Sequence, residues 1–108
     1  MQFSKYVGCG NDFILIDNRP LHFPTQNRSL ISNLCHRQLG IGADGIVLLE
    51  NSAIADYKMR IFNADGSEAE MCGNGIRCLF KFIQALGIKG QTFLIETMET
   101  CIRIESDG

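Results

Sequence analysis

The sequence predicts an α+β fold in which a mixed β-sheet wraps around a central apolar helix. Segments with strand character are interleaved with two helical segments in an irregular order, which does not fit repeated βαβ units. The second helical segment, residues 73–86, is apolar on nearly all sides. Its one polar stripe consists of Arg77, Lys81 and Gln84. A helix of this kind needs apolar cover on most of its surface, and a curved sheet supplies that cover.

Six segments have the alternating or β-branched pattern that is typical of strands. They are residues 1–7, 13–18, 45–50, 57–63, 92–98 and 101–105. Apolar residues recur at helical spacing over residues 25–39, which predicts a first helix with Thr25 as its N-cap and Gly40 just beyond its end.

The segment "FNADGSEAE" at residues 62–70 is rich in turn residues. We predict that Asp65, Glu68 and Glu70 lie in a solvated turn. An alternative is that Glu68 or Glu70 caps or tunes the helix that follows.

The composition indicates one ordinary globular domain. The chain has 108 residues, of which 45% are hydrophobic and 20% charged. Its ten basic residues are scattered and outnumbered by twelve acidic ones, so no nucleic-acid partner is expected. The sequence has neither an apolar run of membrane-spanning length nor the core of a signal peptide, so we expect no membrane partner and a cytoplasmic location.

Cysteine is the residue type that raises the question of function. The five cysteines are odd in number and form no CxxC pair, which argues against a disulfide framework or a zinc site, so we expect reduced thiols and no metal. Cys72 stands directly before Gly73, at the predicted helix start. The unpaired N–H groups and partial positive charge there would favour an anion and a thiolate.

Three chemical uses of a thiolate at position 72 can be separated. A Cys-His nucleophile needs a placed imidazole, and a metal or redox ligand needs a partner cysteine, whereas a general acid or base needs only an acidic proton nearby. Alternatively, Cys72 is a small buried side chain and Gly73 and Gly75 merely shape the cap. The remaining cysteines are interpreted as core or incidental residues: Cys9, Cys35, Cys78 and Cys101.

Two further segments could line the same site. "GIGADG" at residues 40–45 matches a dinucleotide-binding spacing, but it follows a helix and precedes a strand, the reverse of the required order. It is interpreted as a connection or as a loop that lines a site. Asn11, in "GCGNDF", is a turn residue unless it faces the same cavity as Cys72. Asn63 ends a strand leading toward Cys72, so its amide could contact the same ligand.

Together, "GCGNDF" at 8–13, "GIGADG" at 40–45 and "FNADGSEAEMCGNGIRC" at 62–78 resemble the diaminopimelate epimerases. The match runs in register over nearly the whole chain. The third motif is the most specific, because a proline-racemase-like relative would carry His in place of Asn74 and phenazine-biosynthesis relatives lack the cysteine.

The resemblance implies a cofactor-independent epimerase that interconverts LL- and meso-diaminopimelate on the route to lysine and peptidoglycan. In that family two cysteines, one from each pseudo-symmetric half, flank the α-carbon and exchange protons with opposite faces of it. Carried over residue by residue, the resemblance implies that Cys72 is the catalytic thiol of the first half. Gly73 and Asn74 would belong to the substrate cradle, and Asn11 and Asn63 would contact the substrate.

The resemblance further implies that residues 1–108 form a diaminopimelate epimerase-like half-domain, the N-terminal domain of a two-domain enzyme whose C-terminal domain is absent from this chain. The expected partners of this chain are an amino-acid substrate and the missing half. The full-length protein could form a homodimer. We expect one half alone to be inactive. The alternative is a non-catalytic carboxylate-binding half-domain or a split-chain partner. Three positions depart from the family: Gly45, where some members carry a larger polar residue, and Cys9 and Cys101.

Overall fold

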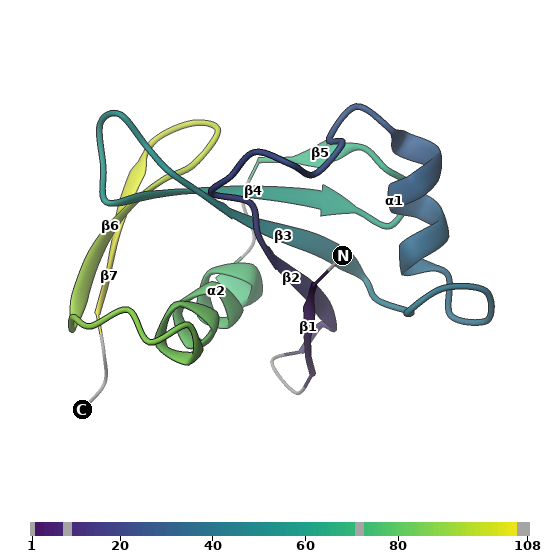
Figure 1. Ribbon diagram of the computed structural model, residues 1–108, viewed down its shortest axis with the longest axis horizontal. Coiled ribbons are helices and arrows are strands. Elements are labelled where there is room, and N and C mark those ends of the chain that lie inside the picture. The colour runs from purple at the N-terminus through teal and green to yellow at the C-terminus, as the bar shows by residue number, and fades with distance from the viewer. Residues whose placement is uncertain (1, 8–9, 71–72, 106–108) are drawn as a thin grey trace.

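A computed structural model describes residues 2–7, 10–70 and 73–105, and their strands form one mixed sheet (Figure 1). The strands are β1 (Ser4–Tyr6), β2 (Phe13–Asp17), β3 (Gly45–Glu50), β4 (Tyr57–Asn63), β5 (Glu68–Ala69), β6 (Thr92–Glu96) and β7 (Cys101–Glu105). Their order is β1-β2-β3-β4-β6-β7, and β5 pairs with β4. The pairs β2–β3 and β4–β6 are parallel and the others antiparallel, which confirms the prediction of a mixed sheet.

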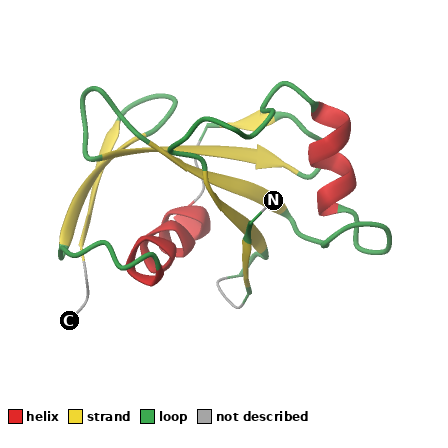
Figure 2. Cartoon of the chain, in the orientation of Figure 1, coloured by secondary structure: helices red, strands yellow, loops and turns green. Residues whose placement is uncertain are grey.

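The sheet curves around helix α2 (Gly73–Ala85), while helix α1 (Arg28–Cys35) covers the opposite face (Figure 2). Alternate residues of β3 divide between the two sides: Val47 and Leu49 join the core beneath α2, and Ile46 and Leu48 join the core beneath α1. Because both faces of β3 are covered, all six of its residues are buried.

The faces of α2 follow the predicted pattern. Its buried residues are Gly75, Cys78, Leu79, Phe82 and Ile83. The expected polar stripe is exposed: Arg77, Lys81 and Gln84. This arrangement confirms the predicted fold class, a sheet wrapped around a largely apolar helix.

Helix α1 is shorter than residues 25–39, so that prediction was wrong at both ends. Its N-cap is Asn27, whose Oδ1 accepts a hydrogen bond from the Leu30 N–H at 3.0 Å. At the other end, Nδ1 of His36 accepts from the N–H groups of Gln38 and Leu39, both at 3.1 Å, and these bonds turn the chain out of the helix. Leu39 is consequently 85% exposed and does not belong to the apolar face.

The segment after β4 contains a strand that the sequence did not predict. Glu68, in β5, forms a two-point ion pair with Arg60 at 2.8 and 3.0 Å, and both side chains are about three-quarters buried. The prediction of a solvated turn was therefore wrong for Glu68, because β4 provides both a backbone and a charged partner. Asp65 does lie in an exposed turn, where its Oδ1 accepts from the Ser67 N–H at 2.8 Å, and Glu70 is exposed.

The last hairpin is regular. Cys101 pairs with Glu96 at the start of β7, so it does not disturb the hairpin. Strand β6 ends at Glu96, before the predicted end, because the N–H of Thr97 donates to the carbonyl of Thr100 at 2.7 Å and closes a turn. Neither helix in the described part of the chain has the length and apolar character needed to cross a bilayer.

Candidate active site

Three of the segments singled out in the sequence meet at one end of the sheet. Strands β2 and β3 run parallel and begin at Phe13 and Gly45, which are paired in register. Strand β4 runs antiparallel to β3 and ends at Asn63, opposite Gly45. The residues just before β2 and β3 and the last residue of β4 therefore lie at the same edge.

The start of α2 joins this edge through a hydrogen bond between two predicted site residues. Nδ2 of Asn74 donates to Oδ1 of Asn11 at 2.7 Å, across 63 positions of sequence, and both residues are half-buried. Gly10 makes room for this contact. Its φ is +90°, and a Cβ there would lie 2.9 Å from Nδ2 of Asn74. The turn at residues 10–12 and the first turn of α2 are thus fitted to one another.

A charged cluster supports Asn11 from the other side. Oδ2 of Asp44 accepts from the Asp12 N–H at 2.8 Å and from Nδ2 of Asn11 at 3.5 Å. Arg37 bridges the two acids, with Nη1 at 2.9 Å from Asp12 and Nη2 at 3.2 Å from Asp44. The hydrogen bond from the Asp12 backbone, followed by those from Asn11 and Arg37 and the charge of Arg37, holds the pKa of Asp44 below its usual value despite some burial.

The sequence did not single out Asp12, Arg37 or Asp44. Asp12 and Asp44 each belong to a motif that the sequence analysis quoted, "GCGNDF" and "GIGADG", and a loop lining a site was one of the two interpretations of the second motif; Arg37 belongs to neither. The contacts of Asp44 with residues 11 and 12 favour that interpretation.

Asn63 lies at the same edge but is bonded within its own turn. Its N–H donates to the carbonyl of Ser67 at 2.8 Å, and its Nδ2 donates to Oγ of Ser67 at 3.1 Å. Within the described residues, no hydrogen bond joins Asn63 to Asn11 or Asn74. The structure thus brings two of the three predicted asparagines into direct contact, and it leaves the exposed side chain of the third on the adjacent turn.

The two glycines at this edge differ in the space around them. Among the described residues outside its own helix backbone, none lies within 4 Å of a Cβ placed on Gly73, so this part of the chain leaves the first turn of α2 uncovered. The N–H groups of that turn have no intrahelical acceptors and carry partial positive charge. A Cβ on Gly45 would lie 2.6 Å from the carbonyl oxygen of Phe62 and 3.3 Å from the Phe13 ring, which explains why this chain has no side chain at position 45.

The catalytic prediction falls on Cys72, which lies outside the described residues, as does Cys9. In sequence, Cys72 immediately precedes Gly73. Cys35 and Cys78 are buried, as predicted for core residues, and Cys101 is half-buried. Burial raises the pKa of the Cys35 thiol. Among the described residues, no group of three or more His, Cys, Asp or Glu side chains is placed to hold a metal ion.

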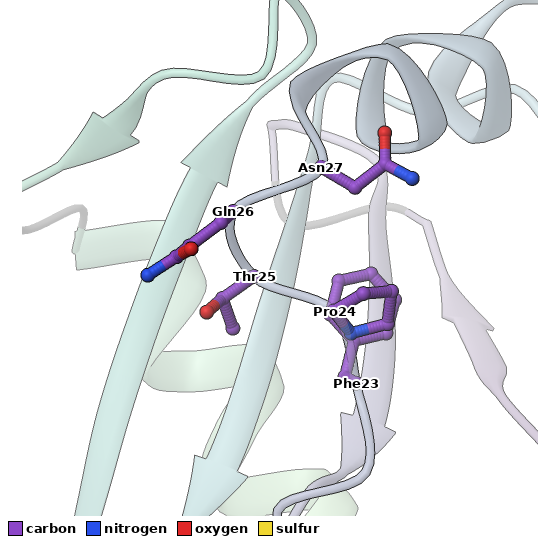
Figure 3. A pocket seen from close by; sticks show the side chains of 5 residues that line it. All are labelled: Phe23, Pro24, Thr25, Gln26 and Asn27. Atoms are coloured by element: carbon purple, nitrogen blue, oxygen red, sulfur yellow. The ribbon is translucent and has the colours of Figure 1, made fainter.

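A depression elsewhere on the surface shares no residue with this site. It is lined by Phe23, Pro24, Thr25, Gln26 and Asn27, which precede α1 (Figure 3). None of these side chains is titratable, so the depression offers neither an acid nor a base.

Comparison with known proteins gives the same family that the three sequence motifs resemble. Residues 3–107 match the family model described as "Diaminopimelate epimerase". The diaminopimelate epimerase of Rippkaea orientalis is 51% identical over 114 residues, covering 100% of this chain and 41% of that protein. The one from Flavobacterium psychrophilum is 54% identical over 96 residues, covering 88% and 38%. The chain thus spans about two fifths of the length of these relatives.

A solved structure has the same fold. The phenazine biosynthesis protein of the PhzF family from Bacillus anthracis superposes with a TM-score of 0.71 over 95% of this chain and 33% of its own. At 19% identity the likeness concerns the fold alone.

Proposed function

This chain belongs to the diaminopimelate epimerase family, and we propose that it supplies one acid–base thiol and half of the substrate cradle to an epimerase that interconverts LL- and meso-diaminopimelate. The observation that carries this proposal is the 2.7 Å hydrogen bond between Asn11 and Asn74. It draws the "GCGNDF" turn to the N-terminus of the helix that begins one residue after Cys72.

The cradle would bind the α-carboxylate of the substrate. The N–H groups of Gly73, Asn74 and Gly75 open α2, and a helix N-terminus favours an anion. Neutralising the carboxylate makes the neighbouring α-proton easier to remove. The lack of any described side chain within 4 Å of a Cβ on Gly73 supports this role, because those residues leave room for a ligand to approach the backbone closely. Asn11 and Asn63, at the same edge, would contact other polar groups of the substrate.

Inversion at carbon requires two opposed acid–base groups. In one direction the Cys72 thiolate takes the α-proton, so that an S–H bond forms as the Cα–H bond breaks, and a thiol on the opposite face gives its proton to the same carbon. The negative charge moves from one sulfur to the other, which leaves the two groups in the protonation states that the reverse reaction needs. Before another turnover in the same direction, Cys72 must release its proton to water and the opposite sulfur must take one up. The partial positive charge at a helix N-terminus lowers the pKa of a thiol placed there. A thiol at position 72 would therefore suit this task without a cofactor.

The opposing thiol would come from the remainder of the longer enzyme, for which this chain forms the N-terminal half. We accordingly expect the 108-residue chain alone not to epimerise diaminopimelate at a useful rate. The reaction would belong to the route to lysine and peptidoglycan, which would place the protein in the cytoplasm.

A chimera tests the proposal. This chain would replace the matching segment of the Rippkaea orientalis relative, to which it is 51% identical. Conversion of LL- to meso-diaminopimelate would then be followed for the parent chimera, for Cys72→Ala, and for Cys101→Ala as a control that removes a half-buried thiol in β7. We expect Cys72→Ala to abolish conversion and Cys101→Ala to preserve it.

Other outcomes would contradict parts of the proposal. Equal conversion by the parent and by Cys72→Ala would exclude Cys72 as an acid–base group. Conversion by the 108-residue chain alone, lost on Cys72→Ala, would show that one half suffices. A folded chimera that binds diaminopimelate without exchanging its α-proton would instead indicate a non-catalytic carboxylate-binding half-domain.

A further inference from the structure

The hydrogen bonds through Asn11 run in one direction. Nδ2 of Asn74 donates to Oδ1 of Asn11, and Nδ2 of Asn11 in turn points to Oδ2 of Asp44. We propose that Asp44 is a positioning residue that fixes which end of each asparagine amide is presented to the substrate. This inference rests on the proposed role of Asn11 and Asn74 in substrate binding.

The direction follows from the chemistry of a carboxylate. An ionised carboxylate only accepts hydrogen bonds, whereas an asparagine amide can turn either its NH2 group or its oxygen toward a neighbour. Asp44 is held in the ionised form by the Asp12 N–H at 2.8 Å and by Arg37 at 3.2 Å. The NH2 end of Asn11 must therefore face Asp44, because the opposite orientation would set two oxygens against one another.

The orientation of Asn11 then determines that of Asn74. With its NH2 group turned to Asp44, Asn11 can offer Asn74 only its oxygen, so Asn74 must donate. The side-chain oxygen of Asn74, Oδ1, accepts no hydrogen bond from the described residues, so this orientation presents it as an acceptor that suits an ammonium group. If the direction were reversed, Asn74 would present its NH2 group, which suits a carboxylate.

The same network gives "GIGADG" a role. The segment does not precede a helix, so it cannot form the dinucleotide site that its glycine spacing resembles. Its acidic residue instead joins the loop before β3 to the turn before β2, and through Asn11 to the first turn of α2. Asp44 lies 33 positions from Asn11 in sequence and acts on the substrate only through it.

Side-chain amide signals in the NMR spectrum of the ¹⁵N-labelled chain test this inference without any substrate. In Asp44→Asn, position 44 can donate as well as accept, so the direction is no longer imposed. We expect the Asn11 and Asn74 NH2 signals to shift, and the hydrogen that Nδ2 of Asn74 donates to Asn11 to exchange with solvent faster than in the parent chain. Asp56→Asn is a matched control, because exposed Asp56 also accepts a backbone N–H, that of Leu94, at 2.8 Å. It should leave both signals in place.

Two further variants separate positioning from a general structural effect. In an Asn11→Ala background, Asp44→Asn should no longer move the Asn74 signals, because the path between the two residues has been removed. Asp44→Glu keeps a group that only accepts hydrogen bonds, so the Asn74 side-chain amide should exchange with solvent as slowly as it does in the parent chain. Three results would overturn the inference. The Asn74 signals could stay unchanged in Asp44→Asn, or they could shift equally with and without Asn11. The third is faster exchange of the Asn74 amide in a folded Asp44→Glu chain.

The outcome is independent of the epimerase proposal. If the amide signals behave as expected but a folded chimera has no activity, the proposed function fails and the orientation by Asp44 stands. If the chimera is active but the amide signals do not change in Asp44→Asn, the orientation by Asp44 fails and the proposed function stands. Should both hold, Asp44→Asn in the chimera should raise the KM for diaminopimelate, and Asp56→Asn should not.

Discussion

Gly10 and Gly73 lie on either side of the same hydrogen bond, and replacing each by alanine should have opposite effects on stability. At Gly10 a Cβ would lie 2.9 Å from Nδ2 of Asn74, and φ is +90°. The Asn74 amide can rotate away, so the main costs are the lost Asn11–Asn74 hydrogen bond, about 1 kcal/mol, and the unfavourable φ for alanine, about 1–2 kcal/mol. The free energy of unfolding should fall by about 2–3 kcal/mol in total.

At Gly73 the same change meets none of the described residues within 4 Å, outside the backbone of its own helix, and it adds a better helix former to the first turn of α2. Gly73→Ala should therefore be neutral or stabilise the chain by up to about 1 kcal/mol. Urea unfolding of the parent, Gly10→Ala and Gly73→Ala chains measures both effects. A loss below about 1 kcal/mol for Gly10→Ala, or an equal loss for both variants, would refute the reasoning that the turn at Gly10 is fitted to Asn74.

Three other predictions concern thiols and charges. At neutral pH iodoacetamide should alkylate Cys72 faster than half-buried Cys101, and equal rates would count against a lowered pKa at the helix start. Arg60→Met leaves the buried carboxylate of Glu50 and the partly buried carboxylate of Glu68 without their cation and should lower the free energy of unfolding in urea by about 2–3 kcal/mol; an unchanged unfolding midpoint would contradict this. The side-chain hydrogen bond from Arg19 lowers the pKa of Asp17 below its unfolded value. Its stabilisation should thus be present above about pH 4 and be lost as the pH falls further. The drop in melting temperature between about pH 5 and about pH 3 should be smaller in Asp17→Asn, and an equal drop would show that Asp17 contributes nothing.

The elements that the sequence predicted well are those whose apolar pattern shows which faces are covered. In α2 one polar stripe marks the exposed side, and in β3 the uninterrupted apolar run fits a strand that is covered on both faces. The bounds of α1 were harder to predict, because Thr25 and Asn27 can both cap a helix. The bond from the Leu30 N–H to Asn27 decides the start, and the bonds to the ring of His36 decide the end.

For the candidate site, the sequence could point to individual residues but not to their partners. The motif resemblance singled out Asn11 and Asn74, and the structure brings them together. The part played by Asp44 depends on the parallel register of β2 with β3, which sets the residues before Phe13 beside those before Gly45. Likewise, the pairing of Glu68 with Arg60 depends on β5 folding back onto β4, and no local pattern indicates that return.

The most direct test of a two-thiol epimerase that uses Cys72 is deuterium incorporation at the α-carbon by the Cys72→Ala chimera in D2O, measured separately from LL- and meso-diaminopimelate. A single remaining thiol can reach only one face of the carbon. We therefore expect exchange at the α-carbon of only one of the two stereoisomers, without inversion, while the parent chimera exchanges and inverts both. Inversion of either isomer by Cys72→Ala would contradict the assignment of Cys72 as one of the two acid–base groups.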